Sequence, residues 1–156
     1  MANRLSLIEI FEQIGAPNPE DWARSQEGEG IPQLARYLFL RQAWRQVIPK
    51  DDLTWMDAEL QRTPGSPGAT AVPALSRLLS LGADKQDIAT IVRTMQWQLL
   101  FRMCYLLDDP GDVEDVVSEI AWGLFTVDAA GKPLEHIGGL HESVLETEPS
   151  GTEMKS

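Results

Sequence analysis

Two histidines near the C-terminus come closest, by type and spacing, to a metal site or a catalytic base. His136 and His141 each have a glutamate beside them, and a carboxylate can orient an imidazole for either task. Their separation of five residues misses the one-turn spacing of a helical zinc pair, and no cysteine pair completes a site. Gly138 and Gly139 favour a flexible bend between them. We expect no metal and no cofactor. His136 and His141 are weak candidate metal ligands, and we expect both to have surface or packing roles.

A second group of chemistry-bearing residues lies in the acid-free stretch 31–50. Arg41 and Arg45 are one helical turn apart there, with Tyr37 and Trp44 close by on the same helix. Arginine beside aromatic rings is typical of protein interfaces, and also of sites for phosphate or single-stranded nucleic acid. The same arginines can instead pair with acids elsewhere in the chain. The pattern leaves these three interpretations open.

Residues 85–107 form the longest apolar stretch and should be the central helix. Ile88, Val92, Met95, Leu99 and Leu106 share one face of it. Trp97, Phe101 and Tyr105 follow one another at four-residue spacing on a second face. A helix that is apolar nearly all round is normally surrounded by others, which predicts core packing. The alternative is that the aromatic stripe lines a ligand pocket.

Two arginines interrupt this apolar helix, Arg93 and Arg102. A buried guanidinium without a partner is costly, so each should meet a carboxylate or extend along its stem to solvent. Asp108 and Asp109, directly after the helix, are the first candidate partners. The sequence therefore predicts internal ion pairs among these four residues.

No pattern in the chain states a reaction. Cys104 is the single cysteine and lies in an apolar run, so it predicts a small buried hydrophobe rather than a reactive thiol. The loop 63–73 lacks the Gly-Lys-Ser/Thr ending of a phosphate-binding loop, and no Gly-x-Ser-x-Gly turn is present. We predict no catalytic residues, and enzymatic activity stays open but disfavoured.

The charge of the chain is concentrated at its C-terminal end. Residues 1–50 carry six basic and six acidic side chains, whereas residues 111–156 carry two and ten, out of a net charge of −11. An acidic third beside the basic helix of residues 32–48 predicts internal pairing, a charged partner, or both. The net negative charge disfavours nucleic acid, since phosphate contacts need local positive charge.

The elements that must position these residues are mostly helices. Caps, prolines and glycines predict a mainly α, single-domain bundle of about five to seven helices with a small C-terminal β-hairpin and an extended acidic tail. We expect one domain over residues 1–146, with the hairpin at about 121–137 packed on the helical body, and a flexible tail over 147–156. The expected helices cover about 6–15, 19–25, 32–48, 52–63, 73–81, 85–107 and 112–119, with a loop over 26–30.

Two function classes follow from these features. The first is a non-enzymatic cytoplasmic protein-binding module, such as an acidic immunity- or antitoxin-like inhibitor or an adaptor for a basic partner. The second is a small-molecule or anion-binding protein or an enzyme, with a pocket between the helices at 32–48 and 85–107. A homo-oligomer is a third option. No membrane span or secretion signal is expected. The residues assigned to the ligand or partner site are Tyr37, Arg41, Trp44, Arg45, Trp97 and Phe101.

Overall fold

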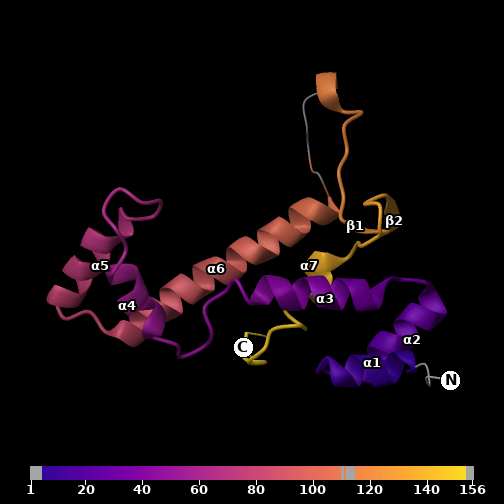
Figure 1. Ribbon diagram of the computed structural model, residues 1–156, viewed down its shortest axis with the longest axis horizontal. Coiled ribbons are helices and arrows are strands. Elements are labelled where there is room, and N and C mark those ends of the chain that lie inside the picture. Colours follow the sequence, from indigo (N-terminus) through magenta and orange to yellow (C-terminus); the bar gives the residue numbers. More distant parts are fainter. Residues whose placement is uncertain (1–4, 110, 112–114, 154–156) are drawn as a thin grey trace. The chain divides into compact units, whose positions relative to one another are not determined.

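The computed structural model describes residues 5–109, 111 and 115–153, and it confirms the mainly α fold. That part holds seven α-helices and a two-stranded antiparallel hairpin, and it is 54% helical (Figure 1). The chain divides into two compact units. We call Met1–Trp44 with Leu100–Ser156 the terminal unit and Arg45–Leu99 the central unit. Each is described by itself, and the single domain over residues 1–146 stays a prediction.

The first helix of the terminal unit, α1 (Leu7–Gln13), begins at the predicted capping box. The Ser6 Oγ accepts a hydrogen bond from the backbone N–H of Glu9 at 3.3 Å, and the Glu9 carboxylate accepts one from the Ser6 backbone N–H at 2.6 Å. The Ser6 backbone N–H and the Ser6 hydroxyl, which donates to the same carboxylate at 2.8 Å, lower the pKa of Glu9 because they favour its charged form. Gly15 follows the helix in the left-handed conformation (φ 74°) and turns the chain.

The second helix, α2 (Pro19–Glu29), is longer than the sequence suggests. The expected loop over residues 26–30 is wrong, because the helix continues through Gly28 and ends at Gly30, which takes the left-handed conformation. The Gln26 side chain accepts a hydrogen bond from the backbone N–H of Leu34 at 2.8 Å and so fixes the turn into the next helix.

An aromatic cluster forms the core of these first helices. Phe11 stacks on Trp22 with ring centroids 6.2 Å apart, and Tyr37 meets both rings edge-on at 6.1 and 5.6 Å. The Tyr37 hydroxyl donates a hydrogen bond to the Gly15 carbonyl at 3.0 Å. Burial of three large rings is the main apolar contribution here, since each buries roughly 150–250 Å².

The third helix, α3 (Gln33–Trp44), ends four residues before the predicted Ile48. Beyond this end, within the central unit, the Ile48 backbone bonds to side chains instead of to a helix. Its N–H donates to the Gln96 side chain at 2.8 Å, and its carbonyl accepts from Arg93 at 2.6 Å. Side chains thus replace the helical bonds that Ile48 would otherwise make.

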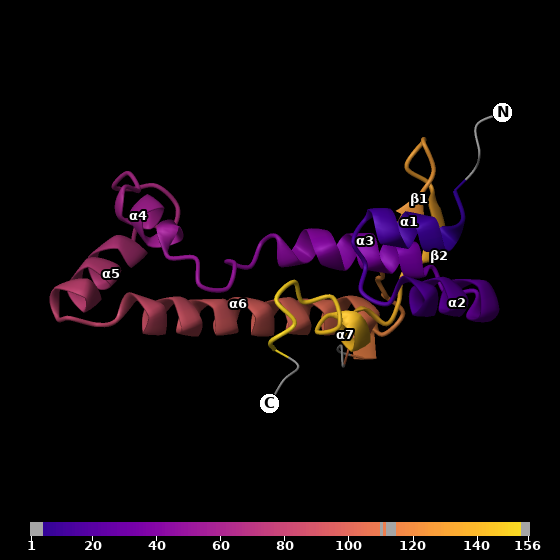
Figure 2. The same cartoon turned by 90° about the horizontal axis from the view of Figure 1, so that it is seen from below.

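The central unit contains α4 (Thr54–Leu60), α5 (Ala71–Ser80) and the first part of α6 (Lys85–Asp108), as Figure 2 shows. Asp52 supports the start of α4 by accepting from the Thr54 backbone N–H at 2.8 Å. The unit's buried apolar cluster is small and consists of Met56, Leu75 and Ala89.

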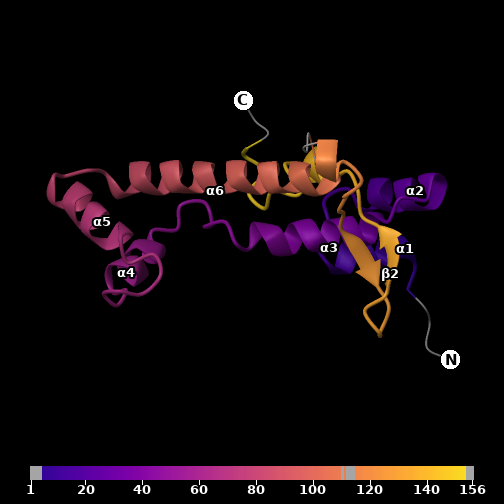
Figure 3. The ribbon, with the colours of Figure 1, turned by 90° about the horizontal axis from the view of Figure 1, so that it is seen from above.

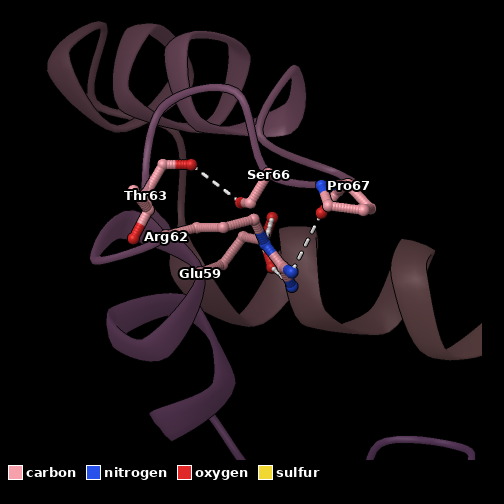
Figure 4. Close-up of polar contacts among 5 residues, drawn as sticks. All are labelled: Glu59, Arg62, Thr63, Ser66 and Pro67. Atoms are coloured by element: carbon pink, nitrogen blue, oxygen red, sulfur yellow. Dashed lines mark hydrogen bonds and ion pairs between the residues drawn. The ribbon is translucent and has the colours of Figure 1, made fainter.

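The Pro/Gly-rich loop between α4 and α5 is ordered by one arginine (Figure 4). Arg62 makes a two-pronged ion pair with Glu59, at 2.9 Å and 2.6 Å, and donates to the Pro67 carbonyl at 3.1 Å. Ser66 closes a tighter turn by donating to the Thr63 carbonyl at 2.7 Å. The loop therefore has a structural explanation that involves no ligand.

The long helix α6 is not enclosed on all sides, which corrects the expectation of a surrounded core helix. One side is buried, at Ala89, Arg93 and Cys104. The other side leaves large apolar side chains substantially exposed, because within each unit the packing elements cover only one side of the helix. These exposed residues are Ile91, Met95, Leu99, Met103, Tyr105 and Leu106.

The chain after α6 is less regular than predicted. The helix expected over 112–119 is a short 3₁₀ turn at Asp115–Val117, and residues 112–114 lie outside the described part. The hairpin pairs β1 (Phe125–Val127) with β2 (Pro133–His136) around a turn, shown as paired arrows in Figure 3. A last helix, α7 (Leu140–Ser143), follows.

The start of the expected tail is packed rather than extended. Thr147 and Glu148 are buried, and the Thr147 hydroxyl donates to the Ser143 carbonyl at 3.1 Å. The Glu148 carboxylate accepts from the backbone N–H groups of Ser150 and Thr152, both at 2.9 Å. The carboxylate thus folds the chain into a turn, which the polar composition of this segment did not indicate. Flexibility of residues 147–156 stays a prediction.

Candidate functional site

A carboxylate–histidine pair in the terminal unit joins the end of α6 to α7. The Asp108 Oδ2 accepts the backbone N–H of His141 at 2.8 Å and lies 2.6 Å from its Nδ1. The Asp108 side chain is only 7% exposed, and the Tyr105 ring packs on the imidazole at 4.9 Å. Because the two residues are 33 positions apart, this pair holds together the two ends of a long excursion of the chain.

Arg36 of α3 is the arginine that meets the acidic C-terminal third. Its side chain is buried, and its Nη1 lies 3.4 Å from the Ser143 hydroxyl, a long hydrogen bond. Burial lowers the pKa of Arg36, while the charges of Glu142 and Asp108 act in the opposite direction. The guanidinium therefore sits as a buried cation near carboxylates, which supports one part of the predicted internal electrostatics.

Gly139 lies directly against the guanidinium of Arg36. A Cβ at Gly139 would lie 2.5 Å from the Arg36 Nη2, and its φ of 69° is left-handed. Only glycine therefore lets the backbone approach the guanidinium so closely. The bend expected at this position exists, and its function in the structure is to seat Arg36.

Tyr37 and Trp44, both predicted as binding residues, are used inside the terminal unit. Tyr37 belongs to the aromatic core, and the Trp44 indole donates to the Val144 carbonyl at 2.7 Å while nearly fully buried. Two α3 side chains, Arg36 and Trp44, thus hold the segment that follows the hairpin. This docking explains why that part of the acidic third is packed.

The remaining predicted binding residues lie in different places. Arg41 and Phe101 belong to the terminal unit, where both are half-buried and Phe101 meets the His141 ring edge-on at 6.4 Å. Arg45 and Trp97 belong to the central unit. Arg45 is exposed there, and the Trp97 Nε1 is buried without a hydrogen-bond partner among the described residues.

The predicted ion-pair residues also separate. Arg93 is buried and donates to the Ile48 carbonyl, whereas Arg102 is exposed. Asp108 takes His141 as its partner, and Asp109 accepts from the Gly111 backbone N–H at 2.9 Å. Sequence spacing did not reveal the Asp108–His141 contact, because the fold and not the local order brings these residues together.

The two histidines have unlike surroundings. His136 lies beside the Phe125 ring at 5.1 Å, and a Cβ at Gly123 would come within 2.9 Å of its Nε2. His141 is held by Asp108 instead. Within residues 5–109, 111 and 115–153, no group of three or more metal-ligating side chains is present.

Cys104 is buried on the enclosed side of α6. Desolvation and the nearby Asp108 charge raise its pKa to about 12. The thiol is therefore protonated near neutral pH, and a nucleophilic or metal-binding thiolate is not favoured there.

Residues 115–136 of the terminal unit, which we call the acidic arm, form its most exposed apolar segment. The sequence predicted that the hairpin packs on the helical body. The exposed fractions of its large apolar side chains correct this prediction. Val116 is 92% exposed, and five further large apolar residues of the arm are at least two-fifths exposed, whereas Val117 and Leu124 are partly buried. The arm is attached through the Trp122 indole, which donates to the Leu106 carbonyl at 2.8 Å. Its exposed apolar residues are Val116, Ile120, Trp122, Phe125, Val127 and Leu134.

Acidic side chains accompany these apolar residues along the arm. Four acids and a single lysine lie within it, and all five side chains are exposed. The sequence indicated the charge but not that these acids would alternate with uncovered apolar groups. The acids are Asp115, Glu119, Asp128 and Glu135.

The chain matches no known family when compared with protein-family models, and searches of curated proteins and of solved structures find no match either. Among the helices of the described residues, none is both long and apolar enough to cross a membrane. Interpretation of the site therefore depends on its own chemistry.

Proposed function

We propose that this chain is a non-enzymatic cytoplasmic protein-binding module that presents its acidic arm to a basic protein. The supporting observation is the arm's combination of exposed apolar side chains, such as Ile120 and Phe125, with the exposed acids Glu119 and Glu135. Contiguous exposed apolar surface with a polar rim is typical of interaction sites.

The two kinds of side chain have separate tasks in this proposal. The acids attract a basic surface over a distance and orient it, which raises the association rate. The apolar groups, above all Trp122 and Phe125, then lose contact with water and hold the complex together. An inhibitor of a basic effector, of the immunity or antitoxin kind, or an adaptor for a basic protein would each use such an arm.

A small-molecule or anion site is the less supported alternative. Two of its proposed lining residues, Tyr37 and Trp44, already donate hydrogen bonds to backbone carbonyls in the core of the terminal unit. Freeing them would uncover buried carbonyl groups, which is costly. The exposed arm requires no such rearrangement.

The proposal can be tested with charge-reversed variants of the intact chain. The arm variant carries Glu119→Lys and Glu135→Lys, and the control carries Glu12→Lys and Glu27→Lys, which change the net charge equally on exposed positions of α1 and α2. Proteins captured from the native host by the original chain are identified by mass spectrometry, and the captured protein is purified and titrated with all three chains.

We expect a basic protein that binds the original chain and the control but binds the arm variant far more weakly. Binding should also weaken as salt rises from about 0.1 M to about 1 M, where the Debye length falls from about 10 Å to about 3 Å. Equal loss in the arm variant and the control, or binding that ignores salt, would contradict the proposal.

A further inference from the structure

The central unit has an apolar helix face of its own. Ile91, Met95 and Leu99 recur every four residues along α6 and expose 60%, 63% and 55% of their surfaces. The opposite side of the same helix is buried at Ala89 and Arg93. Three large apolar side chains in one row are more than the scattered exposure that a protein surface usually shows. This row, the Met95 face, therefore needs an occupant.

The charge distribution indicates what that occupant is. The central unit contains six basic and six acidic residues and so has no net charge, whereas the terminal unit carries the whole −11. Between Ile88 and Leu99 the one charged residue is Arg93, which is buried and donates to the Ile48 carbonyl. A charged partner would find no opposite charge on the Met95 face. Two copies of this chain, which repel one another through their terminal units, meet least repulsion here.

The spacing of the row is also self-complementary. When two such helices pack antiparallel about a twofold axis at Met95, Met95 meets its own counterpart and Ile91 of each copy meets Leu99 of the other. Side chains of similar size then oppose each other at both ends. We propose that the Met95 face binds a second copy of this chain as an antiparallel, twofold-symmetric helix pair.

Opposite charges placed at the axis test this geometry directly. The full-length chain, a Met95→Lys variant, a Met95→Asp variant and an equimolar mixture of the two variants are compared by sedimentation velocity over a concentration series. Like charges would face each other in each variant alone, and opposite charges would face each other in the mixture. We expect the original chain to dimerise, each variant to raise the dimer dissociation constant by at least about tenfold, and the mixture to recover dimer.

Leu5→Lys is the matched control, since it adds the same charge at an exposed apolar residue of the other unit, outside the acidic arm. It should dimerise like the original chain, and circular dichroism should show every variant folded, because residue 95 is exposed. Three results would overturn the proposal: an original chain that stays monomeric at about 1 mM, where even a dimer with a dissociation constant of about 1 mM is about half assembled; a dimer that tolerates Met95→Lys; or variants whose mixture recovers nothing.

Discussion

Asp108 receives both N–H groups that His141 offers to it, one from the backbone at 2.8 Å and one from the imidazole at 2.6 Å. This pair joins the end of α6 to the start of α7, and the acidic arm lies between these two helices in sequence. Beside it, Arg36 and Trp44 of α3 hold α7 and the residue that follows it. The protein thus holds together Asp108 and His141, which flank the arm in sequence, while most large apolar side chains of the arm stay exposed.

Removing the Asp108 carboxylate should weaken the junction between α6 and α7. Asp108→Ala leaves the His141 N–H groups without their acceptor in a largely buried place, and we expect a loss of about 2–3 kcal/mol in the free energy of unfolding. Urea unfolding followed by circular dichroism measures it. Asp115→Ala removes an equal charge from an exposed position and should change stability by no more than about 0.5 kcal/mol. Similar losses of stability for both variants would mean that Asp108 does not hold α7 against the end of α6.

The Trp44 indole should matter for its N–H as well as for its size. Trp44→Phe keeps an aromatic ring but removes the stronger of two donors to the buried Val144 carbonyl, which keeps only the Thr147 hydroxyl at 3.0 Å, and this should cost about 0.5–1.5 kcal/mol. Trp122→Phe removes a similar bond to the Leu106 carbonyl at a more exposed site and should cost less. Thermal unfolding of the two variants compares them, and the reverse order would argue against docking through Trp44.

Two glycines with the same backbone conformation allow the cost of backbone strain to be measured apart from the cost of a side-chain clash. Gly139 and Gly30 both have φ 69°, but a Cβ would clash with Arg36 at Gly139 and meets nothing within 4 Å at Gly30. Gly30→Ala should therefore cost only the left-handed penalty of about 1–2 kcal/mol. Gly139→Ala should cost clearly more in the same denaturant titration, because the guanidinium must also move. Equal costs would show that Arg36 does not rest against Gly139.

The buried thiol predicts a pH effect with a definite sign. Because the pKa of Cys104 is raised to about 12, the native state keeps its proton at a pH where the unfolded chain has lost it. Stability from this residue is present below pH about 9 and declines as pH rises towards about 12. The stability of the original chain relative to Cys104→Ala should shrink across that range. Iodoacetamide should label the native thiol slowly and the urea-unfolded thiol fast, whereas fast native labelling would contradict burial.

Local chemistry made the starts of α1 and α6 predictable from the sequence. Ser6 and Glu9 form the expected capping box, and Asp84 supports the start of α6 by accepting from the Gln86 backbone N–H at 2.6 Å. The predicted end of α2 was wrong, because Gly28 and Gly30 can both end a helix and only packing selects between them. Helix type and approximate position therefore follow from residues close in sequence.

The candidate site did not follow in the same way. Arg36 and Trp44 share one buried side of α3 with Gln33, Tyr37 and Leu40, and this helical spacing was the available signal for Arg36. Arg41 and Arg45 have the sequence pattern of a binding site instead, because they stand close to aromatic residues in sequence. The Asp108–His141 contact and the exposure of the arm depend on tertiary packing over a long sequence separation, which periodicity does not report.

Hydrogen exchange with mass spectrometry on the intact chain, alone and with the purified basic protein captured from its host, tests the central claim most directly. Alone, amides of residues 140–148 should exchange slowly and those of the acidic arm fast. With the partner at low salt, protection should appear over residues 115–136 and disappear at high salt. Protection of α1 and α2 with an unchanged arm would contradict the account.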